Sequence, residues 1–167
     1  MVTVLKIGGS LITNKSSEVP EANLENIRRI SREISESKVK ELVLVHGAGS
    51  YGHPIVKRTG IHKGLNGKVL ELSETQRLQN ELNILVCKEL IKNGVPAFPF
   101  QPSSNAVMRN ERLVFFDLQN LKGLLKEGLV PVLFGVPCFD VVKGCSILSG
   151  DTIVSYIAKK LRGKILF

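Results

Sequence analysis

The chain has 167 residues, of which 43% are hydrophobic and 23% charged, so it is long enough to bury the core of one ordinary globular domain. Its apolar runs all fall short of the roughly 20 residues that a membrane-spanning helix needs. The amino terminus passes directly into a strand-like pattern without the basic and apolar stretches of a signal peptide, so we expect a cytoplasmic protein that binds no membrane.

The charge balance indicates what the protein binds, and the cysteines indicate whether it holds disulfides or zinc. Lysines and arginines outnumber acidic residues by 23 to 15, which gives a net charge of +8. They are scattered along the chain, without a basic run or interleaved aromatic residues, so the pattern disfavours nucleic acid and favours a small anionic substrate. Cys87, Cys138 and Cys145 fit neither a disulfide framework nor a zinc site, and we expect reduced thiols.

The hydrophobic pattern alternates between short apolar runs, typical of buried strands, and longer segments with apolar residues three and four positions apart, typical of amphipathic helices. In chain order it predicts a strand over 2–7, a short element over 10–15, a helix over 22–35, a strand over 42–45, a loop over 60–67, a long helix over 68–93, a strand over 96–100, a hairpin over 107–116, a helix over 117–126, a strand over 130–134, a second hairpin over 138–148, a helix over 149–161 and a strand over 164–167. This order predicts an α/β fold with a largely parallel central sheet, helices on both faces, and small β-hairpins over the substrate site.

Two glycine-rich turns follow the first two predicted strands. Gly8 and Gly9 end the strand that carries Lys6, and the segment 47–52 places three glycines after the strand 42–45. A backbone with few side chains can direct its N–H groups at an anion, so two such turns favour two anionic groups held face to face, as phosphoryl transfer requires. The second turn matches Gly-x-Gly-x-x-Gly, but no strand with a terminal acidic residue follows as in a dinucleotide-binding unit, and the chain has no P-loop.

Each polar residue near these turns is compatible with two roles. Lys6 either lies on an exposed face or directs its ammonium at a phosphate, and Lys15 has a spacing typical of a surface lysine. His53 fits a donor to a phosphate oxygen or a cap of the local backbone, whereas His46, directly after the strand, is expected to be structural. Asp151 fits an N-cap or a group that orients a lysine ammonium.

Five segments in a fixed order resemble the amino acid kinase superfamily and, within it, the isopentenyl phosphate kinase family. These segments are Lys6-Ile7-Gly8-Gly9-Ser10, Lys15, the stretch 45–54, Gln101-Pro102-Ser103-Ser104, and Ile147-Leu148-Ser149-Gly150-Asp151. The Lys-x-Gly-Gly-Ser start is shared by the superfamily. The Gly-His-Pro ending of the second turn resembles the isopentenyl phosphate kinases, in which a histidine at this position contacts the substrate phosphate.

The resemblance implies transfer of the γ-phosphoryl group of ATP to isopentenyl phosphate, with Mg²⁺, to give isopentenyl diphosphate and ADP. By carry-over, Lys6 and Lys15 neutralise the transferring group, with Lys15 as transition-state stabiliser, and Asp151 holds the lysines in place. On the nucleotide side, the resemblance implies that the amides of Gly8, Gly9 and Ser10 bind the ATP phosphates and that Ala48 packs there. On the acceptor side, it implies that Gly47, Gly52 and His53 bind the substrate phosphate and that Gly150 approaches the substrate closely. The long helix 68–93 and Ile147 are expected to supply an apolar pocket for the substrate tail.

Two features depart from the family pattern. Family members continue for roughly another hundred residues, a domain-sized piece that carries most adenine and ribose contacts. Because the strand over 164–167 starts a new element, we expect that this nucleotide-binding part is missing and that the chain alone binds ATP weakly; an edge strand at that place is the alternative. The family also usually has His-Gly-Asp after 130–133, where this chain has Phe134-Gly135-Val136.

We expect a homodimer, and two alternatives to the implied activity stay open. One is another kinase of the superfamily that acts on a carboxylate or a phosphonate, against which His53 argues. The other is a non-catalytic ligand-binding or dimerisation module. Turnover of ATP, assayed after this chain is mixed with the absent C-terminal part, distinguishes these alternatives.

Overall fold

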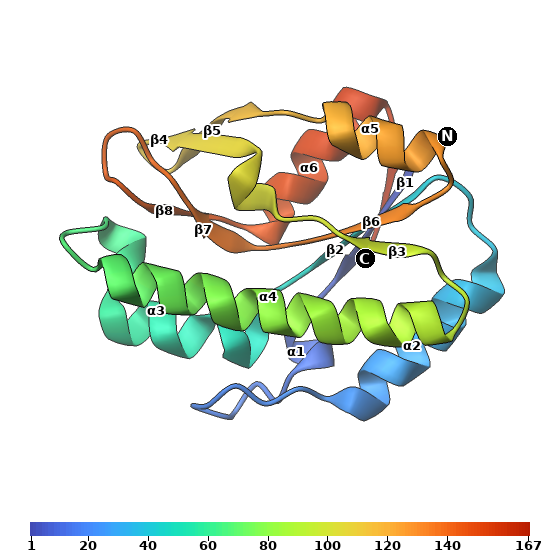
Figure 1. Ribbon diagram of the computed structural model, residues 1–167, viewed down its shortest axis with the longest axis horizontal. Coiled ribbons are helices and arrows are strands. Elements are labelled where there is room, and N and C mark those ends of the chain that lie inside the picture. The colour runs from blue at the N-terminus through green and yellow to red at the C-terminus, as the bar shows by residue number, and fades with distance from the viewer.

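A computed structural model describes residues 1–167 and places a parallel sheet at the centre of the molecule (Figure 1). Its strands lie in the order β3-β6-β2-β1-β9. They are β1 (Thr3–Ile7), β2 (Leu42–His46), β3 (Ala97–Pro99), β6 (Val130–Phe134) and β9 (Lys164–Leu166). Since every neighbouring pair is parallel, all five carboxyl ends lie at one edge of the sheet. The predicted α/β fold with a parallel sheet is confirmed.

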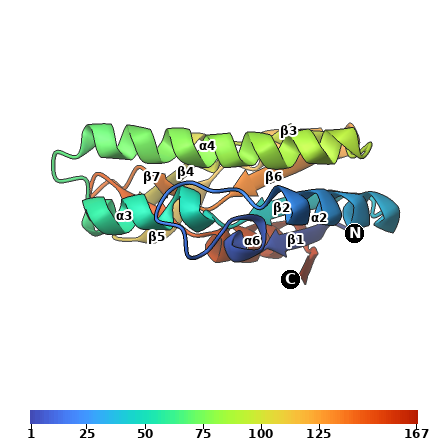
Figure 2. The ribbon, with the colours of Figure 1, turned by 90° about the horizontal axis from the view of Figure 1, so that it is seen from below.

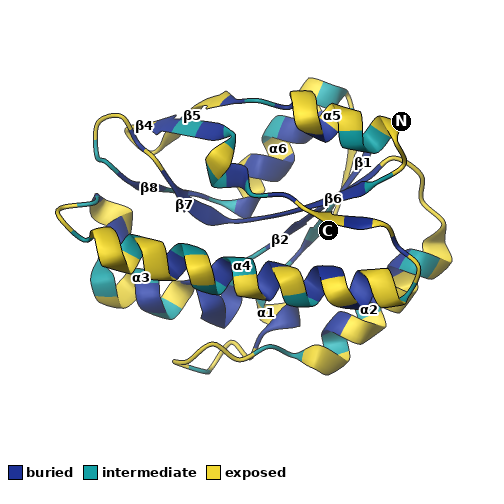
Figure 3. Cartoon of the chain, viewed as in Figure 1, coloured by how far each residue is buried: buried dark blue, intermediate teal, exposed yellow.

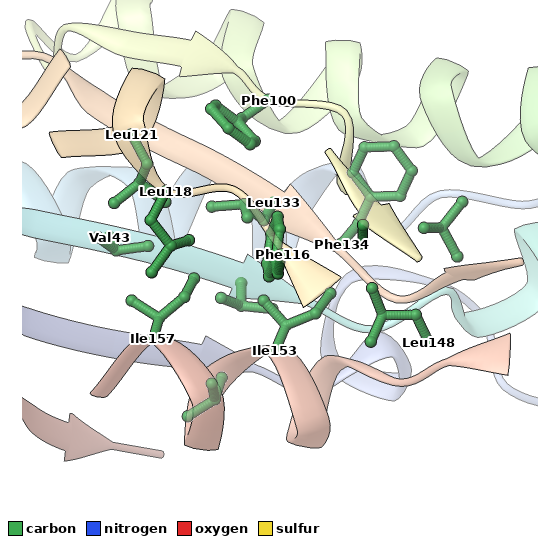
Figure 4. Packing of buried hydrophobic residues seen from close by; sticks show 14 of the residues in the cluster. Val43, Phe100, Phe116, Leu118, Leu121, Leu133, Phe134, Leu148, Ile153 and Ile157 are labelled. Atoms are coloured by element: carbon green, nitrogen blue, oxygen red, sulfur yellow. The ribbon is translucent and has the colours of Figure 1, made fainter. Parts of the chain in front are cut away.

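Helices cover both faces of the sheet, as predicted. The helices α2 (Leu24–Ser37) and α4 (Val69–Lys92) pack on one face, and α5 (Gln119–Lys126) and α6 (Gly150–Leu161) pack on the other. The strand β2 alternates accordingly, with Leu44 in the core beneath α4 and Val45 in the core beneath α6. Figure 4 shows the second of these cores, in which Ile153 and Ile157 of α6 meet Val43 and Leu133. Burial on both faces explains why these strands are apolar throughout.

Small elements gather at the carboxyl edge of the sheet. Two antiparallel hairpins lie there, β4 (Ala106–Arg109) with β5 (Arg112–Phe116), and β7 (Val136–Cys138) with β8 (Ser146–Leu148). The short helices α1 (Gly9–Ile12) and α3 (His53–Thr59) follow β1 and β2, and single 3₁₀ turns span Gly49–Tyr51, Ile61–Lys63 and Pro102–Ser104. Figure 1 shows the hairpins and α3 at the same end of the molecule.

Most predicted elements exist, with boundaries that shift by a few residues. The helix α3 was not predicted, because the glycines around it suggested a loop, although Pro54 near its start and Gly60 in the left-handed region at its end are ordinary helix signals. The helix α5 starts two residues later than predicted, with Leu118 as its N-cap residue, and the Asp117 carboxylate accepts from the Gln119 N–H at 2.8 Å. The second hairpin starts two residues earlier than predicted, at Val136, and its strands are short because the segment 139–145 forms a loop.

A fully buried carboxylate explains that loop. Asp140 accepts hydrogen bonds from the backbone N–H groups of Asn110, Glu111, Val142 and Lys143 and from the Ser146 hydroxyl, at 2.9–3.1 Å. These donors hold the pKa of Asp140 well below its usual range, against the effect of burial. Because Asn110 and Glu111 form the tip of the first hairpin, Asp140 fastens the two hairpins together.

The long helix α4 extends along one side of the molecule (Figure 2). Figure 3 shows that it alternates between buried and exposed residues along its whole length, as expected of a helix with one face on the core. None of the helices has both the length and the apolar character needed to cross a bilayer. The three cysteines are free thiols in the core, and burial raises the pKa of Cys87 to about 12.

Candidate active site

The two glycine turns lie side by side at the carboxyl edge of the sheet. Ile7 and His46 are paired in the register of β1 and β2, so residues 8–10 (the first turn) and residues 47–52 (the second turn) start next to each other. A Cβ atom on Gly9 would lie 2.5 Å from the Gly49 nitrogen, and one on Gly47 would lie 2.6 Å from the Gly9 nitrogen. The two backbones are therefore in direct contact, and only glycine fits at Gly9 and Gly47.

Thr13 joins the two turns. Its hydroxyl donates to the Gly9 carbonyl at 2.8 Å and accepts from the Ser50 N–H at 3.1 Å. Gly49 has a φ of +50°, and a Cβ there would press on Thr13 and on the Gly9 carbonyl oxygen at 2.8 Å. The sequence analysis missed Thr13, because a single threonine after an apolar pair carries no local signal of a contact 37 positions away.

The turns differ in the N–H groups that they offer. In the first turn, the N–H groups of Gly8, Gly9 and Ser10 have no acceptor among the hydrogen bonds of the protein. In the second turn, the Gly47 N–H donates to the Ile7 carbonyl at 3.0 Å and the Gly52 N–H to the Gly49 carbonyl at 3.3 Å. The unused N–H groups of that turn are those of Ala48 and Gly49. Gly47 and Gly52 thus contribute close approach of the backbone, not hydrogen-bond donors.

Lys6 and Asp151 form an ion pair between β1 and α6. Asp151 does not cap α6, because the Ser149 hydroxyl accepts from the Thr152 N–H at 3.1 Å and so is the N-cap. Of its two compatible roles, Asp151 therefore has the one that orients a lysine ammonium. It contacts Lys6 but not Lys15, which corrects the expectation that it holds both lysines.

A cleft of about 380 Å³ lies between the two turns. It brings together four residues predicted to act at the site, Gly9, Ser10, Lys15 and His53, and is completed by Gly49, Ser50 and Pro54. Lys15 and His53 are both exposed and have no side-chain partner, so their polar atoms are free to meet an anion. Gly150 begins α6 on the opposite face of the sheet, and a Cβ there would lie 3.6 Å from the His46 carbonyl oxygen.

His46 is buried beneath the second turn, which agrees with the structural role expected for it. Its Nδ1 lies 2.9 Å from the Gly47 carbonyl oxygen and its Nε2 lies 3.0 Å from the Asn83 side-chain oxygen. Burial lowers the pKa of His46, although both of these contacts favour the protonated ring. Phe134, which replaces the histidine usual in the family, stacks on the imidazole with ring centroids 5.5 Å apart.

The inner face of α4 is polar where it passes the second turn. Thr75, Gln79 and Asn83 follow one another at intervals of four and are all buried. The Gln79 side-chain oxygen has no partner, and its amide group lies against Gly52. The first half of α4 therefore does not form the apolar pocket predicted for it, and the cleft between the turns has no hydrophobic side chain in its lining. Polar residues at intervals of four beside the apolar stripe of this helix were the signal for this face.

The segment 101–104 joins α4 to the hairpins through amide groups. The Gln101 Nε2 donates to the Gln76 side-chain oxygen at 2.6 Å and to the Ser103 hydroxyl at 2.7 Å. Gln76 donates in turn to the Pro137 carbonyl at 2.5 Å. The motif 101–104 therefore positions β7 against α4, and no charged group takes part.

Comparisons with known proteins agree with this geometry. The model of the Amino acid kinase family matches residues 1–167. The isopentenyl phosphate kinases of Methanothermobacter thermautotrophicus and Methanocaldococcus jannaschii are each 34% identical, over 95% and 99% of this chain. The chain spans 62% of the length of the first and 67% of the second. A solved isopentenyl phosphate kinase superposes with a TM-score of 0.94 at 32% identity, over 99% of this chain and 71% of that chain. The chain belongs to the amino acid kinase family.

Proposed function

We propose that this protein transfers the γ-phosphoryl group of ATP to isopentenyl phosphate, giving isopentenyl diphosphate and ADP. The contact between the two glycine turns is the observation that carries the proposal, because it sets two groups of unused N–H donors next to each other. Two phosphates on these donors would lie face to face, and phosphoryl transfer needs mainly such positioning and the neutralisation of charge. The names of the relatives supply the chemical identity of the acceptor.

The first turn is assigned to the ATP phosphates. Its N–H groups at Gly8, Gly9 and Ser10 are unused, and the Lys6 ammonium, oriented by Asp151, lies at the end of the same strand. Backbone donors of this kind hold phosphate oxygens in a fixed position and lose no side-chain entropy on binding. Lys15 borders the cleft between the turns, so we assign to it the charge that develops on the transferring group.

The second turn is assigned to the phosphate of the acceptor. His53 lines the cleft, and its ring can donate to a phosphate oxygen while the N–H groups of Ala48 and Gly49 hold the others. A substrate that carries its own phosphate fits a site with a histidine and unused amides. A site for an amino-acid carboxylate would also need a group for the ammonium, and the cleft lining contains no acidic side chain.

Magnesium would enter this site with the nucleotide. No group of three or more His, Cys, Asp or Glu side chains converges in the chain, and Asp151 already pairs with Lys6. The residues present therefore do not fit a dedicated magnesium site. Because Mg²⁺ commonly keeps several water ligands and binds through substrate phosphates, we treat MgATP as the co-substrate.

We also propose a homodimer whose interface includes the outer face of α4. Ile84 and Ile91 are seven positions apart on that helix and are 59% and 57% exposed. Phe98 of the edge strand β3, which contacts α4, is 42% exposed. The double substitution Ile84→Glu and Ile91→Glu should convert the dimer to a monomer. Size-exclusion chromatography with light scattering measures the mass. A wild-type protein that is monomeric at tens of micromolar contradicts this interface.

Phosphoryl transfer itself is tested by ³¹P NMR on a protein that extends this chain to the length of its relatives, with ATP and three acceptors, isopentenyl phosphate, a phosphonate and an amino acid. We expect ADP and isopentenyl diphosphate to form together, with no phosphorylated product from the amino acid. Product from the phosphonate or amino acid alone would assign the chain to another activity of its family. Binding of isopentenyl phosphate with no turnover of ATP would instead favour the ligand-binding module.

A further inference from the structure

His46 lies between two hydrogen-bond acceptors. Its Nδ1 is 2.9 Å from the Gly47 carbonyl oxygen, and its Nε2 is 3.0 Å from the Asn83 side-chain oxygen. A neutral imidazole has one N–H, so it donates to one of these oxygens and turns a lone pair toward the other. Only the imidazolium, with two N–H groups, donates to both.

The Asn83 amide does not resolve this conflict by turning over. Its Nδ2 donates to the Val132 carbonyl at 3.3 Å. A rotated amide would donate to the His46 ring, but it would then place its oxygen against the Val132 carbonyl oxygen. Either orientation of the amide leaves one pair of acceptors in contact while the ring is neutral.

The surroundings of the ring favour its neutral form in the free protein. The ring is buried, which disfavours the imidazolium, and no charged side chain hydrogen-bonds to it. On the α4 side it faces Asn83 and, behind it, the Cys87 thiol, which burial keeps neutral. On the β6 side Phe134 stacks at 5.5 Å and an interplanar angle of 15°, and an aromatic face attracts a cation. The Lys6–Asp151 pair lies toward α6, on the other face of the sheet.

We propose that His46 takes up a proton from solvent when an anionic phosphate binds at the second turn, and that this proton strengthens the binding of the anion. The inference rests on the acceptor-phosphate site of the proposed function and adds a proton-linked positioning residue to it. The bound anion supplies the negative charge that the buried imidazolium lacks. A nearby opposite charge favours the protonated form of such a group and typically raises its pKa by about 1–3 units.

The link between ring and anion is the peptide between Gly47 and Ala48. Its carbonyl oxygen accepts from His46, and its N–H is the unused donor of Ala48. In a trans peptide the C=O and N–H point in opposite directions, so a ring that fixes the carbonyl directs the N–H away from itself. A protonated ring also polarises that peptide and makes the Ala48 N–H a stronger donor.

The sign of the pH dependence follows from reciprocity. If the anion raises the pKa of His46, protonation of His46 raises the affinity for the anion by the same factor. Affinity for a permanently charged anion should then fall as the pH rises through the His46 pKa of the complex. The affinity should change about tenfold for each unit by which the anion shifts this pKa.

Histidine ¹⁵N NMR on the wild-type protein tests the proposal, with inorganic sulfate as the anion because sulfate does not titrate between about pH 5 and 8. The chain has three histidines, so each ring is followed separately. We expect saturating sulfate to protonate both nitrogens of His46 and to raise its pKa by about 1–3 units. His62, exposed and outside the cleft, is the internal control and should keep its titration.

Three other outcomes overturn the proposal in distinguishable ways. If sulfate moves the amide signals of Ala48 and Gly49 but leaves the charge of His46 unchanged, the linkage is wrong and the proposed function stands. If only His53 changes its titration, the proton belongs to that residue. If no amide in the second turn responds to sulfate, the anion site and the linkage both fail.

A variant of Asn83 tests whether the two acceptors around the His46 ring stabilise its protonated form. Asn83→Leu removes the acceptor at Nε2, so a neutral ring protonated at Nδ1 satisfies its one remaining contact. We expect the variant to keep the sulfate-dependent amide shifts, with a His46 pKa below that of the wild-type protein both with and without sulfate, because the acceptor that stabilises the protonated ring is gone. A His46 pKa as high as that of the wild-type protein contradicts the role assigned to the two acceptors.

Discussion

The two glycine turns have the same position in the fold and different chemistry. Each follows a parallel strand at the carboxyl edge of the sheet, and each contains a glycine, Gly9 or Gly47, that lets the other backbone approach. The first turn leaves three consecutive N–H groups unused. In the second turn the N–H groups of Gly47 and Gly52 donate to carbonyl groups of the protein, and His53, which follows it, lines the cleft. Similar glycine patterns therefore do not predict similar binding, because the hydrogen bonds of the backbone decide which donors remain.

Gly49→Ala should break the contact between the turns, with the largest expected effect. A side chain there combines a left-handed φ of +50° with overlap against Thr13, and these together should cost about 2–5 kcal/mol of folding free energy in urea unfolding. Gly67→Ala is the matched control, because its φ is +78° and nothing lies within 4 Å of the added Cβ. Equal losses in the two variants would show that the turns do not need their close contact.

Lys15→Ala tests the role of the cleft between the turns. If Lys15 stabilises charge that develops in the transition state, its loss lowers kcat and kcat/KM together by about 10²–10³-fold, with both KM values nearly unchanged. Steady-state assays with ATP and isopentenyl phosphate measure kcat and the two KM values. Lys15→Arg should recover part of the loss, since a planar guanidinium does not replace a point charge. A raised KM at constant kcat would make Lys15 a binding residue.

His53→Ala tests whether the second turn binds the acceptor phosphate and not ATP. A hydrogen bond to a charged phosphate is worth about 1.5–3 kcal/mol. In a complete enzyme, kcat/KM for isopentenyl phosphate should therefore fall by the corresponding factor while the KM for ATP stays nearly the same. His62→Ala, outside the cleft, is the control. Equal losses for both substrates would mean that His53 does not belong to the acceptor side alone.

Thr13→Val should give the smallest of these effects and act on both turns equally. It leaves the buried Ser50 N–H without an acceptor, which should lower the free energy of unfolding by about 1–3 kcal/mol. Thr13→Ser keeps the hydroxyl and loses one methyl group, so it should cost only about 0.8 kcal/mol. If the two variants are equally stable, the hydroxyl does not join the turns.

The elements that the sequence predicted well are those with a repeated pattern. The apolar run of β2 and the stepped apolar residues of α2 specify a strand and a helix by local chemistry, and both are present within two or three residues of their predicted bounds. The positions of Gly8 and Gly9 after a strand, and of the second turn after the next, were enough to place the two turns together once the sheet was parallel.

The residues that the sequence analysis missed act through contacts between distant segments. Thr13 reaches Ser50, Asn83 reaches His46, and Asp140 reaches Asn110, each across about 30 positions or more. No local pattern encodes such a contact, because the side chain meets its partner only after the sheet and its covering helices have formed. Buried polar groups of this kind were visible only as exceptions to an apolar pattern, as along the inner face of α4.

The Lys6–Asp151 ion pair has a consequence for the order in which the protein forms. Its partners are 145 positions apart, so Lys6 leaves the ribosome long before the helix that orients it has been made. A contact of such high sequence separation is among the last to be established in folding, since the loop that it closes carries a large entropic cost. A growing or truncated chain that lacks α6 has no Asp151 to orient the Lys6 ammonium, so this ion pair forms only in a chain synthesised as far as α6.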